Sequence, residues 1–313
     1  MTSPLADRPY VTFALFAYNQ EKYIREAVEG AFSQTYSPLE IILSDDCSSD
    51  RTFEIMEQMA RKYQGPHTIR LNRQRENSGI GAHVSHIARI SQGQLIVLAA
   101  GDDISECERT GRILDFWVAS NREIAAIESG YTEIDCDGGV LGTVVKNRMF
   151  AHPTLDLAVV KNEHFVGATA AYDADLFKEF PPFLQTLVHE DCALLTRTYL
   201  LRRSCGFIPE PLVRYRRSVG VSAAYNNPHR GDITFTYRAY TDYLQKLVDS
   251  QGFSDTTLEA IAVGALRRRL AEVIVFNSRS KLKAIALTVR HLGFFWSLRA
   301  WGKWVWQTKI HKK

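Results

Sequence analysis

The chain has 313 residues, of which 45% are hydrophobic and 23% are charged. These proportions are ordinary for a folded protein and exclude disordered, collagen-like and low-complexity chains. The net charge of +3 conceals an asymmetry, because residues 261–313 carry +11, which leaves −8 for the rest of the chain. An acidic body with one basic end indicates that this end meets an anionic surface.

The cysteines and the N-terminus exclude several further classes. The five cysteines are odd in number and no two have C-x-x-C spacing, which predicts free thiols in a reducing compartment rather than disulfides or structural zinc. Residues 1–8 lack the apolar stretch of a signal peptide. No window reaches the roughly 18 uncharged apolar residues that a transmembrane helix needs.

Strands and helices alternate over the first hundred residues. The apolar, β-branched run 10–17 predicts a strand buried on both faces, followed by a helix that Asn19 caps and that runs to about residue 32. Further strands are expected over 39–43, 68–71 and 95–100, with helices over about 50–63, capped by Asp50, and about 79–92. This alternation predicts an α/β fold with a Rossmann-like, mostly parallel sheet and helices on both faces. Ligands of such sheets bind beyond the carboxyl ends of the strands.

The remainder of the chain divides into a middle region and a helical end. We expect helices over 110–120 and 191–201, strands over 125–133 and 140–145, and helical structure from about 232 onwards. The turn-rich stretch 222–231 places a domain boundary near residue 225. The predicted division is therefore a catalytic domain over 1–225 and a helical C-terminal region over 226–313.

Two pairs of carboxylates follow predicted strands. Asp45-Asp46 follows the strand 39–43, and Asp102-Asp103 follows the strand 95–100. Either pair alone is compatible with a solvated turn or a helix cap. Adjacent carboxylates in a cleft repel each other unless a cation or hydrogen-bond donors neutralise them. Two pairs at one edge of a sheet favour a ligand site. Mg²⁺ or Mn²⁺ would suit this site, because such an ion typically binds one or two protein carboxylates and takes its other ligands from phosphate and water.

The order of these segments resembles the family 2 glycosyltransferases, inverting enzymes with the A-type glycosyltransferase fold. The resemblance covers most of residues 10–222 and is carried by the segments 11–52, 76–79, 93–103, 164–177, 189–191 and 214–222. It implies transfer of a sugar from a nucleotide-diphosphate sugar to a hydroxyl of a glycan or lipid-linked acceptor, in surface polysaccharide biosynthesis. Such a reaction needs a base for the hydroxyl and charge relief on the leaving diphosphate.

The resemblance also implies roles for single residues. Asp191 would be the catalytic base, and Asp103 would bind the Mg²⁺ or Mn²⁺ held by the donor diphosphate. Asp102 would contact the ribose or the sugar. Around the nucleotide base, for which uridine is the default, Tyr18 would lie against the ring and Asp46 would hydrogen-bond it. The remaining donor-binding candidates are Asn19, Asn77, Gly79, Arg214 and Arg217, with Arg214, Arg216 and Arg217 in a loop that closes on the diphosphate. Glu190, Gly167 and Thr169 are candidates for contact with the acceptor or for support of the base.

The sequence departs from the family pattern at several positions. Ala100 stands where another acid often precedes the metal-binding pair, and Phe16 stands where a small polar residue is common. The helix after Gly79 lacks an Arg-Asn pair that family members often carry, and His83 or His86 is the candidate replacement.

The C-terminal tail interleaves six aromatic residues with cations over residues 291–313. This pattern predicts a helix in the interface of an anionic membrane, and hence a cytoplasmic protein held on the inner face of the cell membrane. The alternative is a helix packed on the catalytic domain or on a second subunit of a homo-oligomer. A nucleic-acid partner is disfavoured because the acidic body would repel it.

Two other functions remain open at this point. One is a nucleotidyltransferase that makes nucleotide sugars, but the segment 17–21 lacks the glycine and arginine that such enzymes carry after their first strand. The other is a non-catalytic, membrane-associated scaffold with the same fold. The presence of Asp46, Asp103 and Asp191 argues against a loss of activity.

Overall fold

The computed structural model describes residues 8–145 and 165–217, with single positions and short runs between 219 and 289. Its strands are β1 (Val11–Ala17), β2 (Leu39–Asp45), β3 (Thr68–Arg73), β4 (Leu95–Ala100), β5 (Ile104–Ser105), β6 (Ile124–Ile134), β7 (Val140–Val144), β8 (Ala170–Asp173) and β9 (Ser204–Arg216). Its helices are α1 (Ile24–Phe32), α2 (Thr52–Lys62), α3 (Ile80–Ile90), α4 (Arg109–Ala119), α5 (Asp175–Lys178) and α6 (Glu190–Leu200), with a short 3₁₀ helix over Gly167–Thr169.

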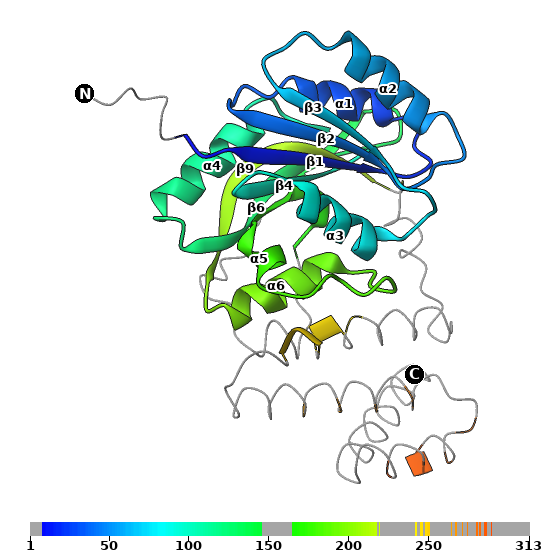
Figure 1. The fold of residues 1–313 in the computed structure, drawn as a ribbon, viewed down its shortest axis with the longest axis vertical. Helices are drawn as coiled ribbons and strands as arrows, with labels where there is room; N and C mark the ends of the chain where they lie inside the picture. Colours follow the sequence, from blue (N-terminus) through cyan, green and yellow to red (C-terminus); the bar gives the residue numbers. More distant parts are fainter. Residues whose placement is uncertain are drawn as a thin grey trace.

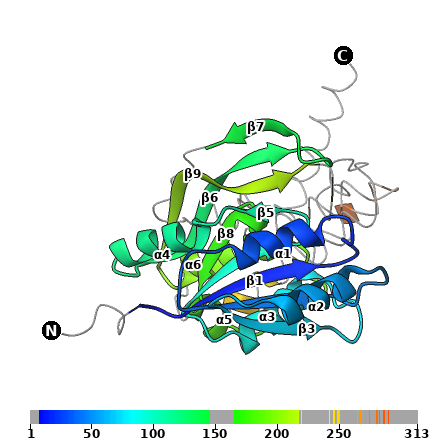
Figure 2. The ribbon, with the colours of Figure 1, turned by 90° about the horizontal axis from the view of Figure 1, so that it is seen from above.

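The strands form one sheet in the order β3-β2-β1-β4-β8-β6-β9-β5, with β7 paired to β6. The first four strands in this order are parallel, and Val11 of β1 pairs with Leu39 on one side and Leu95 on the other. Strand β8 runs antiparallel to both β4 and β6, whereas β6 and β9 are parallel again. The prediction of a mostly parallel sheet is confirmed, and Figure 2 shows β6, β7 and β9 together at one end of it.

Helices cover both faces of the sheet (Figure 1). Side chains of α1, α2 and α4 share one buried cluster with Phe13 and Leu15 of β1, and those of α3, α5 and α6 share another with Ala14 and Phe16. Successive residues of a strand point to opposite faces, so β1 contributes to both clusters. This explains why all seven of its residues are buried and why its sequence shows no polar alternation.

The segment after β1 differs from the prediction. Asn19 does not cap a helix, because it lies at φ 51° in a turn and α1 begins five residues later at Ile24. The left-handed conformation is one that asparagine tolerates better than most residues. The Asn19 side chain instead accepts a hydrogen bond from the Ser49 backbone N–H (2.9 Å), which joins this turn to the one after β2.

The sequence did not predict strand β9, which includes Arg214 and Arg216, two residues that were expected in a loop. Pro209 and Pro211 interrupt its sequence pattern, and proline is typical of bulges and strand edges. The pairing of β9 with β6 shifts register between Ser129 and Gly130, opposite the prolines. Arg214 and Arg216 therefore belong to the sheet, because hydrogen bonds to β6 continue to the end of the strand.

Arg216 is a buried anchor at the end of β9. Its Nε donates to the carbonyl oxygen of Asp102 (3.0 Å), and its Nη1 donates to the carbonyl oxygens of Asp135 and Cys136 (both 3.0 Å). Its Nη2 pairs with Glu26 of α1 (2.7 Å). One side chain thus joins the ends of β4, β6 and β9 to α1.

The C-terminal predictions fall largely on residues outside the described ranges. The proposed boundary near residue 225 and the aromatic tail 291–313 lie outside them, so the division at 225 stays a prediction. The described positions from 242 to 250 are helical, in line with the expected helical region. Within the part of the chain that the structure describes, no helix has the length and apolar character needed to span a membrane.

We expect Arg216→Met to lower the free energy of unfolding by about 2 kcal/mol or more, because buried carbonyl acceptors lose their donor. Arg217→Met is the matched control, since the Arg217 side chain is half exposed and pairs with Glu133, an interaction worth about 1 kcal/mol or less. Urea unfolding of both variants measures the difference. Equal losses would contradict the anchoring role of Arg216.

Candidate active site

The carboxyl ends of β1, β2 and β4 are joined at one edge of the sheet. The Asp46 backbone N–H donates to the carbonyl of Ala17 (2.9 Å), and the Gly101 N–H donates to the carbonyl of Phe16 (2.8 Å). Both carboxylate pairs therefore lie at the edge where parallel sheets bind ligands.

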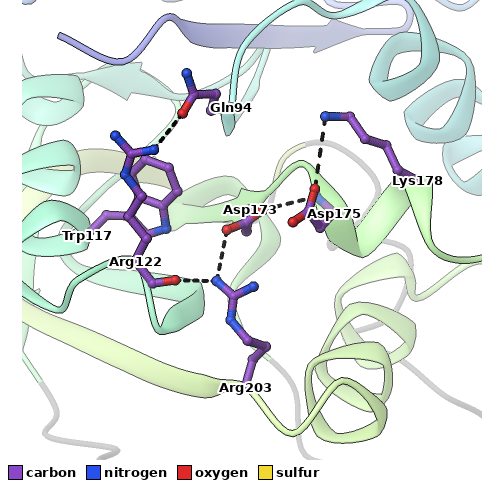
Figure 3. A pocket seen from close by; sticks show the side chains of 7 residues that line it. All are labelled: Gln94, Trp117, Arg122, Asp173, Asp175, Lys178 and Arg203. Carbon is purple, nitrogen blue, oxygen red and sulfur yellow. Dashed lines mark hydrogen bonds and ion pairs between the residues drawn. The ribbon is translucent and has the colours of Figure 1, made fainter. Parts of the chain in front are cut away.

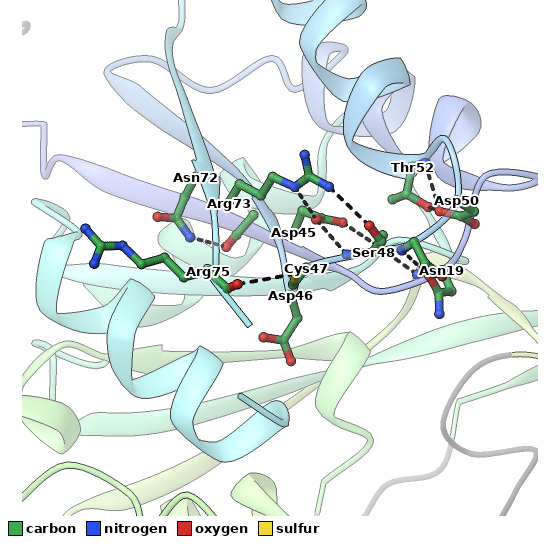
Figure 4. Close-up of polar contacts among 12 residues, drawn as sticks. Asn19, Asp45, Asp46, Cys47, Ser48, Asp50, Thr52, Asn72, Arg73 and Arg75 are labelled. Atoms are coloured by element: carbon green, nitrogen blue, oxygen red, sulfur yellow. Dashed lines mark hydrogen bonds and ion pairs between the residues drawn. The ribbon is translucent and has the colours of Figure 1, made fainter. Parts of the chain in front are cut away.

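The two acids of the first pair have different surroundings (Figure 4). Asp45 has a fully buried side chain that accepts hydrogen bonds from the backbone N–H (2.9 Å) and the hydroxyl of Ser48, and that pairs with Arg73. It therefore stabilises the turn after β2. Asp46 accepts hydrogen bonds from the backbone N–H and the hydroxyl of Ser78 (both 2.9 Å) and from the Gly79 N–H (3.0 Å).

Asp46 thus connects β2 to the start of α3 and keeps capacity for a ligand. A carboxylate offers about four acceptor sites, and three of those on Asp46 are used within the protein. Of the other predicted donor residues, Asn77 accepts a hydrogen bond from the Gly79 N–H (3.1 Å), and Tyr18 is 44% exposed in the turn after β1. Hydrogen bonds join the three loops after β1, β2 and β3, which carry Tyr18 and Asn19, Asp46, and Asn77 and Gly79.

The second pair lies almost completely buried at the end of β4. Asp102 and Asp103 are 8% and 6% exposed. Burial, and for Asp103 also the neighbouring Asp102 charge, raises the pKa of both carboxyls, although Arg216 opposes the rise. The Arg216 backbone N–H donates to Asp103 Oδ1 (2.7 Å), and the fully buried Arg109 guanidinium adds a positive charge. Such a pair gains stability from a cation.

Asp102 and Asp103 at the end of β4 fit a divalent cation whose remaining ligands come from the phosphates of a substrate and from water. Within the described residues no group of three or more His, Cys, Asp or Glu side chains forms a complete ligand set. Mg²⁺ and Mn²⁺ commonly use one or two protein carboxylates and take their other ligands from phosphate and water. Asp102 and Asp103 supply such a partial set.

The arginines predicted for the diphosphate are engaged within the protein. Arg214, which lies in β9 rather than in a loop, pairs through Nε with Glu106 (2.8 Å). Arg217 follows the strand directly and pairs through Nη1 with Glu133 (2.9 Å). Both side chains are about half exposed, so either could exchange its carboxylate partner for a phosphate.

The candidate base lies at the start of α6 within an acidic cluster. Asp191 Oδ1 accepts a hydrogen bond from the Cys192 N–H (2.8 Å), and the neighbouring Glu190 is half-buried. Burial and the Asp191 charge raise the pKa of Glu190 to about 8. A Cβ atom on Gly167 would stand 3.0 Å from Glu190 Oε1, which places this glycine against the cluster.

The short helix 167–169 connects the acidic cluster to the pair at β4. Thr169 is fully buried and its hydroxyl donates to the carbonyl of Val166 (2.9 Å), so it supports the turn. Between Gly167 and Thr169, the carbonyl of Ala168 accepts a hydrogen bond from Arg109 (2.9 Å), the arginine that faces Asp103.

The histidines expected to replace an arginine on α3 do not supply a cation. His83 is buried, its Nε2 lies 2.5 Å from Ser44 Oγ, and burial lowers its pKa to about 4. His86 bonds to Asn72 (3.3 Å), and burial and the Arg89 charge lower its pKa as well. The His83 imidazole is neutral at pH 7 because a buried cation is costly.

Helix α3 packs tightly on the segment that precedes α6. A Cβ atom at Gly81 would stand 2.8 Å from both the Cβ and the carbonyl oxygen of Leu187. Only glycine permits this approach. The start of α3 and the segment leading to Asp191 therefore lie directly against each other.

A cavity of about 220 Å³ lies at the opposite edge of the sheet, before the start of β4 (Figure 3). Among its charged side chains, Arg203 pairs with Asp173 (2.9 Å), Lys178 pairs with Asp175 (4.0 Å), and Arg122 donates a hydrogen bond to Gln94 (2.9 Å). Since ligands of these sheets bind at the carboxyl ends of the strands, this cavity is not the candidate donor site.

Comparison with known proteins agrees with this geometry. The profile of the family described as "Glycosyl transferase family 2" matches residues 12–180. The putative teichuronic acid biosynthesis glycosyltransferase TuaG of Bacillus subtilis is 28% identical over 131 residues, which are 42% of this chain and 50% of TuaG. This alignment, and one with an uncharacterised Mycobacterium tuberculosis protein, span half or less of those proteins' own lengths.

Solved structures share the fold at low sequence identity. S. aureus TarS 1–349 in complex with UDP-GlcNAc is 17% identical, with a TM-score of 0.58 over 95% of this chain and 80% of that one. The mannosyltransferase PcManGT of Pyrobaculum calidifontis, in complex with GDP-Man and Mn²⁺, is 18% identical, with a TM-score of 0.55 over 96% and 88%. Together with the family match, these likenesses confirm the A-type glycosyltransferase fold. The chain is a member of glycosyltransferase family 2.

Proposed function

We propose that the protein transfers a sugar from a nucleotide-diphosphate sugar to an acceptor hydroxyl with inversion, and that the transfer depends on Mg²⁺ or Mn²⁺. The observation that carries the proposal is the buried pair Asp102-Asp103 at the end of β4. A metal bound there would neutralise the charge that develops on the leaving diphosphate. PcManGT binds Mn²⁺ together with its sugar nucleotide, which supports this proposal.

In this reaction Asp191 accepts the proton of the acceptor hydroxyl while the hydroxyl oxygen attacks the anomeric carbon. The bond from that carbon to the diphosphate oxygen breaks in the same step, and the nucleoside diphosphate leaves with the electron pair. A positioned base typically contributes 10²–10⁴ to the rate.

Donor recognition is assigned to the loops at the ends of β1 and β2. The remaining acceptor site of Asp46 suits the imino N–H of a uracil base, and the exposed Tyr18 ring suits stacking on it. Asp102 would contact the ribose or the sugar. Uridine is the proposed base, in keeping with the UDP-GlcNAc held by TarS. Arg214 and Arg217 would exchange Glu106 and Glu133 for the diphosphate.

The acceptor is proposed to be a glycan or lipid-linked sugar of a surface polysaccharide, as the name of the relative TuaG suggests. A lipid-linked acceptor would lie at a membrane. The basic aromatic tail 291–313 would hold the protein on its anionic inner surface.

Asp103→Asn should lose metal-dependent nucleotide binding and keep its fold, because it removes one metal-binding charge without changing side-chain size. The measurement is the shift in melting temperature caused by UDP with and without MnCl₂, since a ligand of the folded state raises that temperature. Asp175→Asn, at the far edge of the sheet, is the matched control. A parent-like shift in Asp103→Asn would contradict the metal site.

Asp191→Asn should keep donor binding and lose transfer by roughly a hundredfold or more, because an amide cannot take the proton. Steady-state release of nucleoside diphosphate measures the rate, and the UDP-induced melting shift checks binding. Turnover close to that of the parent would reassign the base, and Glu190→Gln would then be the variant to examine.

The intact protein should sediment with anionic vesicles at low salt, whereas a chain that ends near residue 280 should stay in the supernatant. Each cation near such a surface contributes on the order of 1 kcal/mol, and salt screens it. Neutral vesicles are the control for the charge. The alternative, packing of the tail on the protein itself, predicts that truncation destabilises the fold and that the intact chain ignores vesicles.

A further inference from the structure

The described helical positions from 242 to 250 belong to what we call the C-terminal helix. A buried polar face of this helix lies against the start of α6. The spacing of Asp242, Gln245, Lys246 and Asp249 places them on one face of that helix. Each of these residues is between 0% and 3% exposed. Burial of polar groups costs free energy unless each finds a partner, so the hydrogen bonds of this face help to fix its position.

The partners lie within the segment 184–197, before and along α6. The Leu184 backbone N–H donates to Gln245 Oε1 (2.7 Å). Arg197 donates through Nε and Nη2 to the two carboxylate oxygens of Asp249 (2.9 and 3.0 Å), and both of these side chains are buried. These contacts dock the C-terminal helix on the domain that holds the sheet.

The contact of Asp242 has a different consequence, because it holds the residue that precedes the acidic cluster. Asp242 Oδ1 accepts a hydrogen bond from the His189 backbone N–H (3.3 Å), and Oδ2 lies 2.5 Å from His189 Nδ1. His189 is the N-cap residue of α6, and Glu190 and Asp191 follow it directly. The Asp242 carboxylate thus fixes both the backbone and the ring of His189, two residues before the candidate base Asp191.

The same contact influences the charge beside Asp191. Burial lowers the pKa of His189, but the hydrogen bond and charge of Asp242, together with the charges of Asp191 and Glu190, raise it overall. A protonated His189 favours the ionised form of a neighbouring carboxylate, which is the form that a base needs.

We propose that His189 and Asp242 are positioning residues for the transfer reaction, and that the C-terminal helix thereby completes the catalytic centre. Asp242 acts through His189, whose fixed backbone and ring orient Asp191 towards the acceptor hydroxyl. The inference rests on the proposed role of Asp191. A misplacement of about 1 Å at a reacting group can cost up to a hundredfold in rate, so a residue that only orients the base has a measurable effect.

The test compares Asp242→Asn with Asp249→Asn in the full chain. The assay is release of nucleoside diphosphate with MnCl₂ and water as acceptor, from whichever of UDP-GlcNAc, UDP-glucose and GDP-mannose the parent hydrolyses fastest. We expect Asp242→Asn to lower kcat about tenfold or more and to leave the donor KM within about twofold. Asp249→Asn, which loosens the same helix away from His189, should keep kcat within about twofold while losing stability.

A second pair of variants separates orientation from bulk packing. His189→Ala should lose as much kcat as Asp242→Asn, and His189→Asn should recover much of it, because its amide nitrogen can replace Nδ1 as a donor to Asp242. Amide hydrogen exchange over residues 189–193 should accelerate in Asp242→Asn and not in Asp249→Asn, which gives a readout that does not depend on turnover.

The proposal is overturned if Asp242→Asn keeps the parent's kcat and exchange rates, if Asp249→Asn loses kcat equally, or if His189→Asn is no better than His189→Ala. Failure of the underlying function looks different. Parent-like turnover in Asp191→Asn would remove the base, whereas an inactive Asp191→Asn beside a normal Asp242→Asn would remove only the positioning role.

Discussion

The architecture of this site depends on the balance of charge around two adjacent buried carboxylates. Asp102 and Asp103 lie at the end of a strand that is buried on both faces, where ionised groups are poorly solvated. Two buried arginines, Arg109 from α4 and Arg216 from β9, approach the pair from different elements. Helix α4 and strand β9 therefore do more than enclose a core, because they bring the cations that allow two adjacent carboxylates to lie buried within the protein.

The features that could be predicted from the sequence are those with a local signature. A buried strand that ends in two acids marks both the strand end and the candidate site, which is why β2, β4 and the positions of Asp46 and Asp103 can be predicted. The role of Arg216 was not, because its partners lie about 80 to 190 residues away in sequence. Two prolines also conceal β9 by breaking the alternation on which strand prediction depends.

The contact between the C-terminal helix and α6 has a misleading signature of a different kind. Polar residues at positions 242, 245, 246 and 249 have the spacing of a helix face that normally points to solvent. Only the partners found in the folded chain, above all His189 and Arg197, show that this face is buried. Hydrophobic periodicity finds interfaces that are held by apolar burial, and it misses those that are specified by hydrogen bonds.

The close contact between Gly81 and Leu187 limits how this chain can diverge. In-line displacement needs reacting atoms about 3 to 3.5 Å apart, so the proposed donor loop and the helix with the proposed base must keep a fixed distance from each other. A new methyl group at position 81 would force these two parts of the protein apart. Descendants of this chain that acquire new acceptors are therefore expected to vary the rim of the site and to retain the hydrogen atom at position 81.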